Sequence, residues 1–149
     1  FAGLDRDFAV EGVLSASYQM HDSLSASAQF QHDLISEHDG YELQLALRTS
    51  QKAGAITYGA SLGARHRNGD LNDYLIGVSV VEATAQRSAY HPGQSTSPFV
   101  GLDMRIPLNH RAVLFANLDI AFLGKTYKDS PLVDKNTSAS ARFGIAYGF

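Results

Sequence analysis

The sequence has 149 residues, no cysteine and a formal net charge of −3, from 12 Lys and Arg against 15 Asp and Glu. This length suits a single domain over residues 1–149, and the weak acidity argues against a nucleic-acid partner. Without cysteine, a disulfide, a thiolate metal site and a cysteine nucleophile are excluded. No segment has the roughly 18 consecutive apolar residues of a membrane-spanning helix.

Seven segments alternate apolar and polar residues with a period of two, which predicts β-strands. In chain order these segments are 8–20, 23–34, 41–50, 54–65, 99–106, 112–122 and 137–149. In the sixth segment, Leu118 and Ile120 lie on one face, whereas Asn117 and Asp119 lie on the other. Turn-forming Gly, Asn, Asp and Pro residues separate the segments. The sequence therefore predicts an all-β fold.

Residues 73–80 have two interpretations, and the strand count depends on them. As an eighth strand they give an even number, which lets a bacterial barrel close with both ends in the periplasm. As part of a folded outer loop over 66–95 they leave seven strands, and at least one more must come from a preceding segment. Independently of this choice, residues 81–95 can form a short helix that ends before Tyr90. Both interpretations of residues 73–80, as a strand and as part of a loop, stay open here.

The alternation alone fits a soluble sheet or a transmembrane barrel, because both have one apolar face per strand. The segments are as long as the ~9–11 tilted residues that cross a bilayer. Their polar faces are rich in Ser, Gln and Gly and poor in Lys, which suits a lumen better than a solvent-exposed face. We therefore predict an antiparallel, transmembrane, up-and-down β-barrel of seven or eight strands, surrounded by outer-membrane lipid.

The end of the chain is similar to the terminal assembly signal of bacterial outer-membrane barrels. That signal contains a polar residue, a glycine, a hydrophobic residue and a final aromatic residue. The corresponding positions are Arg142, Gly144, Tyr147 and Phe149. The resemblance implies recognition by the barrel-assembly machinery and a multi-pass location in the outer membrane of a Gram-negative cell.

The polar faces of the predicted strands carry charges of both signs. They are Glu11, Asp33, Glu42, Arg48, Arg65, Asp103, Arg105, Asp119 and Arg142. In a narrow barrel these side chains would pair across the lumen, because an unpaired buried charge is costly. In a wider barrel they would line a pore and set its ion preference. We favour the paired lumen and keep the pore as the alternative.

The histidines and serines do not form a recognisable catalytic or metal-binding pattern. His32 and His38 flank a turn that also contains acidic residues, but a solvated turn explains them better than a metal site. Ser36 precedes His38, and Ser88 precedes His91, without a third group placed to orient a nucleophile and its base. We predict no catalytic residue, no metal site and no cofactor.

Several short motifs in fixed order resemble those of the MipA/OmpV family of outer-membrane proteins. They lie at 36–40, 72–79, 82–93, 97–102 and 129–133. Within them, Tyr74, Tyr90 and Pro92 are our candidates for a loop interaction surface. Members of the family are longer than this chain, which implies that it is the C-terminal part of a larger barrel with further strands before residue 1.

The resemblance implies a structural or scaffolding protein. Family members are linked to a scaffold that brings a murein transglycosylase to a murein synthase, and some are linked to adhesion or antibiotic response. Another envelope protein is the alternative partner, and basic residues in 124–136 can meet the phosphates of lipopolysaccharide. The competing functions are a small-solute, porin-like channel and a membrane-embedded lipid hydrolase.

Overall fold

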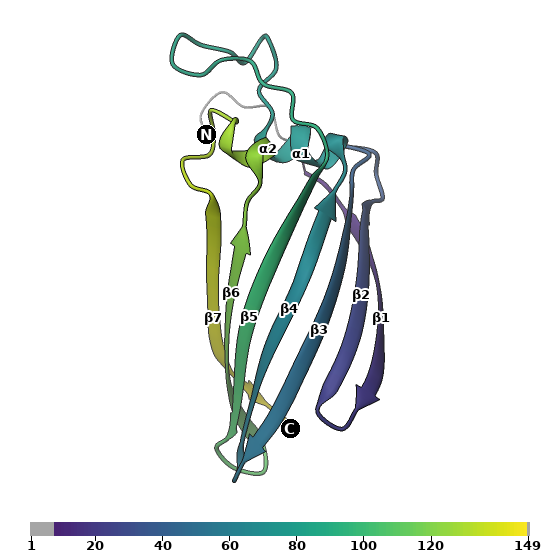
Figure 1. The fold of residues 1–149 in the computed structure, drawn as a ribbon, viewed down its shortest axis with the longest axis vertical. Helices are drawn as coiled ribbons and strands as arrows, with labels where there is room; N and C mark the ends of the chain where they lie inside the picture. The colour runs from purple at the N-terminus through teal and green to yellow at the C-terminus, as the bar shows by residue number, and fades with distance from the viewer. Residues whose placement is uncertain (1–7, 149) are drawn as a thin grey trace.

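The computed structural model describes residues 8–148 and contains one antiparallel sheet of seven strands. Each strand is hydrogen-bonded to its neighbours in the sequence, so the order is up-and-down from β1 to β7 (Figure 1). The strands are β1 (Glu11–His21), β2 (Leu24–Asp33), β3 (Tyr41–Ala53), β4 (Ile56–Arg67), β5 (Ser95–Pro107), β6 (Ala112–Phe122) and β7 (Thr137–Tyr147). Two short helices, α1 (Gly69–Ile76) and α2 (Lys125–Lys128), lie between them.

The predicted all-β, up-and-down fold is confirmed, and each of the seven predicted segments contains a strand. Strand β5 begins earlier than the predicted 99–106, because Ser95 and Ser97 already pair with β4. Among residues 8–148, no helix is long and apolar enough to cross a bilayer.

Residues 73–80 are not a strand, so the eight-strand interpretation is wrong and the folded-loop interpretation is confirmed. Helix α1 covers the first part of this segment because Asn68 caps it: the side-chain oxygen accepts the N–H of Leu71 at 3.2 Å. The helix ends at Gly77, whose N–H donates to the carbonyl of Asp73 at 2.8 Å.

The short helix that residues 81–95 could have formed is absent, because this part of the described chain forms turns and isolated bridges. Val78 pairs with Tyr90, and Thr84 pairs with Arg87, so the segment folds back on itself as an irregular hairpin. Figure 1 shows this hairpin projecting beyond the end of the sheet.

Burial along the strands is the reverse of that in a water-soluble sheet. On β3, Leu43, Leu45 and Leu47 are exposed, while the alternate polar side chains Glu42 and Gln44 are half-buried. On β5, Val100, Leu102 and Met104 are likewise exposed, whereas Ser95, Ser97 and Gly101 are buried together with the ring of Phe99. Along β3 to β5, one face of the sheet is therefore apolar and exposed and the other is mainly polar and shielded, whereas nearly all residues of β1 and β7 are exposed.

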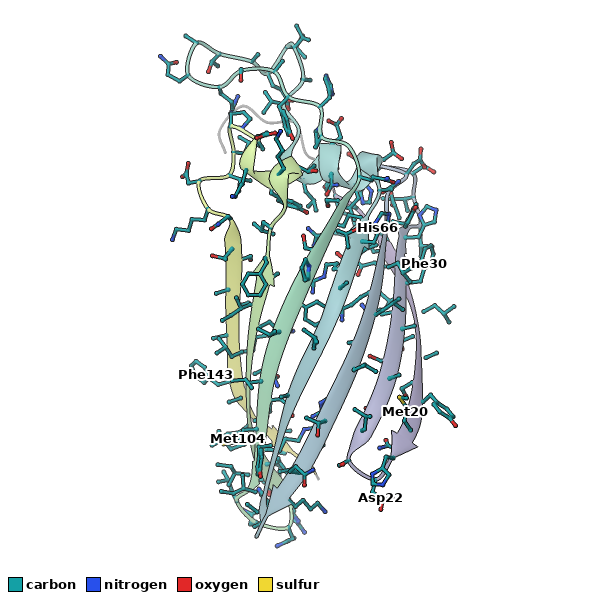
Figure 2. All side chains as sticks on the ribbon, viewed as in Figure 1. Met20, Asp22, Phe30, His66, Met104 and Phe143 are labelled. Carbon is teal, nitrogen blue, oxygen red and sulfur yellow. The ribbon has the colours of Figure 1, made fainter. Side chains whose placement is uncertain are left out.

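The sheet curves around its polar face. A cavity of about 430 Å³ on that face is lined both by Gln29 and Gln31 of β2 and by Ser138, Ser140 and Arg142 of β7. Strands at opposite sides of the sheet therefore face each other across the polar side. In Figure 2 the apolar side chains of Phe30 and Phe143 point outward from the sheet. Among the described residues β1 and β7 are not paired with each other, so the sheet is open.

The two ends of the sheet differ in how the strands are joined. At one end, which we call the turn end, the connections 22–23, 54–55 and 108–111 are short, and Gly54 has the positive φ (+60°) that a tight turn needs. At the other end, the loop end, the connections are long and contain both helices (Figure 1).

Candidate functional site

The polar face contains an ion pair that bridges two strands across a third. On β3, Arg48 donates to the Asp103 carboxylate on β5 through two nitrogens, with Nε 2.9 Å from Oδ1. Gly59 lies between them on β4, where an added Cβ would be 2.7 Å from Asp103 Oδ1. The bidentate pair therefore needs the open space that only glycine leaves.

A second cluster of charges lies nearer the loop end. Glu42 Oε2 accepts from Arg67 Nε at 2.6 Å, and Glu42 Oε1 lies 3.1 Å from Arg65 Nε in an ion pair; the Glu42 side chain is only 12 % exposed. The guanidinium of Arg65 also donates to Gln44 Oε1 and lies 5.6 Å from the centre of the Phe99 ring. Both oxygens of the carboxylate are therefore satisfied, as a nearly buried charge requires.

This cluster continues into the cap, by which we mean α1, α2 and the loops 77–94 and 129–136. Arg67 Nη1 donates to Tyr127 OH at 2.6 Å, and Tyr127 OH donates to Asn72 Oδ1 at 3.1 Å. The Asn72 amide, which is fully buried, donates to Ser95 Oγ and to the carbonyl of Gly93. One chain of hydrogen bonds thus joins the sheet to both helices.

A small apolar core supports the same junction. Leu71, Ile76 and Val78 are buried within the cap, and Ser130 Oγ donates to the carbonyl of Ile76 at 2.7 Å. Tyr90 OH donates to the carbonyl of Thr126 at 2.7 Å, which ties the irregular hairpin to α2. The cap is therefore an ordered structure that covers the loop end of the polar face.

The predicted lumen residues differ in their surroundings. Asp33 serves the turn that follows β2, because it accepts backbone N–H groups from Ile35, His38 and Asp39. Glu11 accepts from Gln31 and lies 3.6 Å from His38 Nε2. These residues and the pairs above lie in the half of the polar face that is nearer the cap, except Arg48–Asp103.

Three predicted lumen residues, Arg105, Asp119 and Arg142, form no ion pair with another described residue. Asp119 and Arg142 line the 430 Å³ cavity together with Glu42 and Arg65. The polar face is therefore paired in part: unpaired Arg105 lies near the turn end, whereas unpaired Asp119 and Arg142 share a cavity with the paired Glu42 and Arg65. Whether it forms a closed lumen or a pore stays a prediction.

The three loop candidates all belong to the cap and its surroundings. The Tyr74 ring lies against His38, with 4.6 Å between ring centres, and Pro92 is buried. Burial raises the pKa of the Tyr90 phenol, and the nearby Asp129 carboxylate raises it further. The phenol therefore stays protonated and can donate its hydrogen bond. Their role in an interaction stays a prediction.

The terminal-signal residues lie on the last strand and the residues after it. Arg142 is opposite Asn117, and Gly144 lies beside the Phe115 ring, where an added Cβ would be 2.8 Å from Cζ. Tyr147 is 53 % exposed. Phe149 lies outside the described residues. Their recognition by assembly machinery stays a prediction.

The histidines of residues 8–148 are dispersed over different contacts. No group of three or more His, Asp and Glu side chains in that range is arranged to hold a metal ion. His32 contacts the Phe30 ring edge-on, whereas the His38 side chain is buried against Tyr74, so the two histidines serve different contacts. His91 Nδ1 lies 3.2 Å from Asp73 Oδ1, and both side chains are exposed.

The sequence analysis missed the network of Arg67, Asn72, Ser95 and Tyr127. A helix-start signal was present, because Asn68 is followed by Asp70 in the first turn. That signal would have placed Asn72 on a helix. Nothing in the spacing could have shown that Tyr127, 60 residues after Arg67, completes the network.

An up-and-down antiparallel sheet with an exposed apolar face, a polar face held by ion pairs, short turns at one end and long loops at the other defines the class of outer-membrane β-barrel proteins. In that class the short turns face the periplasm and the long loops face outward. The family model described as "MltA-interacting protein MipA" matches residues 2–149, and the chain belongs to this family. It is thus an outer-membrane protein of the Gram-negative envelope, as the resemblance implied.

Curated relatives are named as outer-membrane proteins. The chain is 31% identical over 148 residues to outer membrane protein OmpV of Vibrio cholerae, and 30% identical over 148 residues to Omp26La of Vibrio anguillarum. Each match covers 99% of this chain and 57% of the relative. The MltA-interacting protein of Escherichia coli is 25% identical over 78% of this chain and 48% of its own length. No solved structure matches the chain.

The chain therefore spans about half the length of the curated relatives that it matches.

Proposed function

We propose that the chain is part of a structural outer-membrane barrel that serves as a scaffold for a murein-processing enzyme in the periplasm. The observation that carries this function is the cap. It covers the loop end of the polar face through the hydrogen bonds from Arg67 through Tyr127 to Asn72, which favours a closed barrel that works through its surface.

Two further observations support a scaffold. One relative is named MltA-interacting protein, which makes a murein transglycosylase the first partner to test. Within residues 8–148, no serine hydroxyl is hydrogen-bonded to a histidine ring, so the hydrolase alternative gains no support. The scaffold is therefore proposed to act without catalysis.

The direct experiment is co-purification from the envelope. The full-length protein carries an affinity tag and is extracted in mild detergent, and the amount of MltA bound to it is compared with that on an unrelated tagged outer-membrane barrel. We expect at least a ten-fold excess of MltA on this protein. Equal amounts on the two barrels would contradict the scaffold function.

A small-solute channel is the second candidate, because Asp119 and Arg142 line the cavity on the polar face without an ion-pair partner among the described residues. Planar-bilayer recordings of the purified full-length protein separate the two functions. We expect no discrete conductance steps from a capped barrel. Regular steps that depend on Asp119 would instead support the channel.

A further inference from the structure

The turn end of the sheet has an excess of positive charge. Within three residues of the short turns, Lys52, Arg105 and Arg111 stand against the single acidic residue Asp22. The long connections at the loop end have the opposite balance. They hold Glu37, Asp39, Asp70, Asp73, Glu82, Asp129 and Asp134 against Arg87, Lys125, Lys128 and Lys135. The turn end is therefore net positive and the loop end is net negative.

Two of the three cations are held near each other by strand register. Lys52 is opposite Thr57, and Thr57 is opposite Arg105, so the two cations lie on the same face of β3 and β5. Two strand spacings separate their backbones by about 10 Å. Both are exposed, and neither forms an ion pair with a described residue. Their mutual repulsion would be relieved by an anionic partner.

The third cation is on an ordered turn beside an exposed apolar side chain. Asn109 Oδ1 accepts the backbone N–H groups of Arg111 at 2.8 Å and Ala112 at 2.9 Å. The N–H of Leu108 donates to the carbonyl of Ala112 at 2.8 Å. Leu108 is nevertheless 52 % exposed. The turn is thus fixed before any partner binds, which lowers the entropy cost of binding.

We propose that Lys52, Arg105, Leu108 and Arg111, here called the cationic rim, form a docking surface for an acidic segment of a periplasmic protein. The kind of partner rests on the proposed scaffold function. The position of the surface rests on charge and geometry. Short turns face the periplasm in this class of protein, so the rim lies where such a partner would be.

A protein partner fits the rim better than an anionic glycan strand. Arginine and apolar side chains together are typical of protein interfaces, whose centres exclude water. Glycans are usually held by aromatic rings, and the turns 22–23, 54–55 and 108–111 contain no Phe or Tyr. An acidic segment would pair with the cations and cover Leu108.

The test compares two triple charge reversals in the full-length protein. The rim variant carries Lys52→Glu, Arg105→Glu and Arg111→Glu. The matched control carries three Lys→Glu changes in exposed residues at the loop end, namely Lys125→Glu, Lys128→Glu and Lys135→Glu. Both must show the heat-modifiable gel mobility of the wild type. A rim variant with Gln at the same three positions replaces the Glu variant if the latter does not fold.

Binding of three probes to the immobilised protein is measured at 50 and 300 mM NaCl: purified MltA, poly-L-glutamate and purified murein sacculi. We expect MltA and poly-L-glutamate to bind the wild type and the control equally, and the rim variant at least ten-fold more weakly. Higher salt should weaken both interactions with the wild type, because exposed charges are screened. Leu108→Ala should weaken MltA binding and leave poly-L-glutamate binding within two-fold.

The outcomes separate the surface from the scaffold function. Rim-dependent binding of poly-L-glutamate without binding of MltA would support the surface and contradict MltA as the partner. Equal binding of MltA by both variants would support the scaffold function and contradict the cationic rim as its docking surface. Binding of sacculi that depends on the rim, without binding of poly-L-glutamate, would overturn the protein partner in favour of a glycan.

Discussion

The two halves of the polar face show opposite ways of placing charge in one sheet. Near the cap, Glu42 is nearly buried, and both of its carboxylate oxygens are bound by guanidinium groups. Toward the turns, Arg105 is exposed and has no ion-pair partner among the described residues. A charged side chain near the cap is therefore held in an ion pair that belongs to the fold, whereas one near the turns is available to bind a partner.

The largest loss of stability is expected on the apolar face, and it provides a reference for the changes on the polar face. Leu118→Arg should destabilise the protein by about 2–4 kcal/mol, because a cation then faces the bilayer midplane. Asp119→Asn, the adjacent position on the polar face, should cost clearly less. Urea unfolding from lipid vesicles measures both, and the reverse order would mean that the two faces are wrongly assigned.

Glu42→Gln tests the half of the polar face near the cap. The amide keeps the shape of the side chain but loses the charge that two guanidinium groups bind, so we expect a loss of about 2 kcal/mol. Glu37→Gln, on an exposed turn, is the control and should change stability by less than about 0.5 kcal/mol. Equal effects in urea unfolding would remove the distinction between the two halves.

Tyr127→Phe removes one hydroxyl from the network that joins the sheet to the cap. Arg67 loses an acceptor and Asn72 loses a donor, so we expect about 1 kcal/mol of destabilisation and faster proteolysis of the loop 129–136. Tyr58→Phe, on the apolar face, should change neither. A cap that stays equally protected in both variants would mean that apolar packing alone holds it.

The smallest effect is expected for an exposed charge on the polar face that has no ion-pair partner among the described residues. Arg142→Gln removes an exposed charge without an ion-pair partner among residues 8–148, so stability should change by less than about 0.5 kcal/mol. Urea unfolding beside Glu42→Gln provides the comparison. A loss as large as that of Glu42→Gln would show that Arg142 pairs with a residue outside the described part of the chain.

The strands could be predicted where apolar and polar residues alternate along the whole segment. In β3 the leucines alternate with polar residues along the strand, and the structure preserves this as alternating exposure. Residues 73–80 show the limit, because Tyr74, Ile76 and Val78 also alternate. A local hydrogen bond from Asn68 starts a helix there, and the periodicity of side chains does not contain that information.

The candidate site was predictable only in its components. The period of two places Glu42, Arg65 and Asp103 on the polar face, but strand register decides which charges meet. Arg48 reaches Asp103 over a strand only because Gly59 leaves space. Contacts between segments far apart in the chain, such as Arg67 with Tyr127, depend on how the cap folds over the sheet.

Within residues 8–148 the outer edges of β1 and β7 are unpaired, which has a consequence for the order of folding. β1 and β7 are each 11 residues long, and each presents a row of backbone N–H and C=O groups along its outer side. In hydrocarbon every such group without a partner costs several kcal/mol. We therefore expect each edge to gain a partner strand before or during its entry into the bilayer.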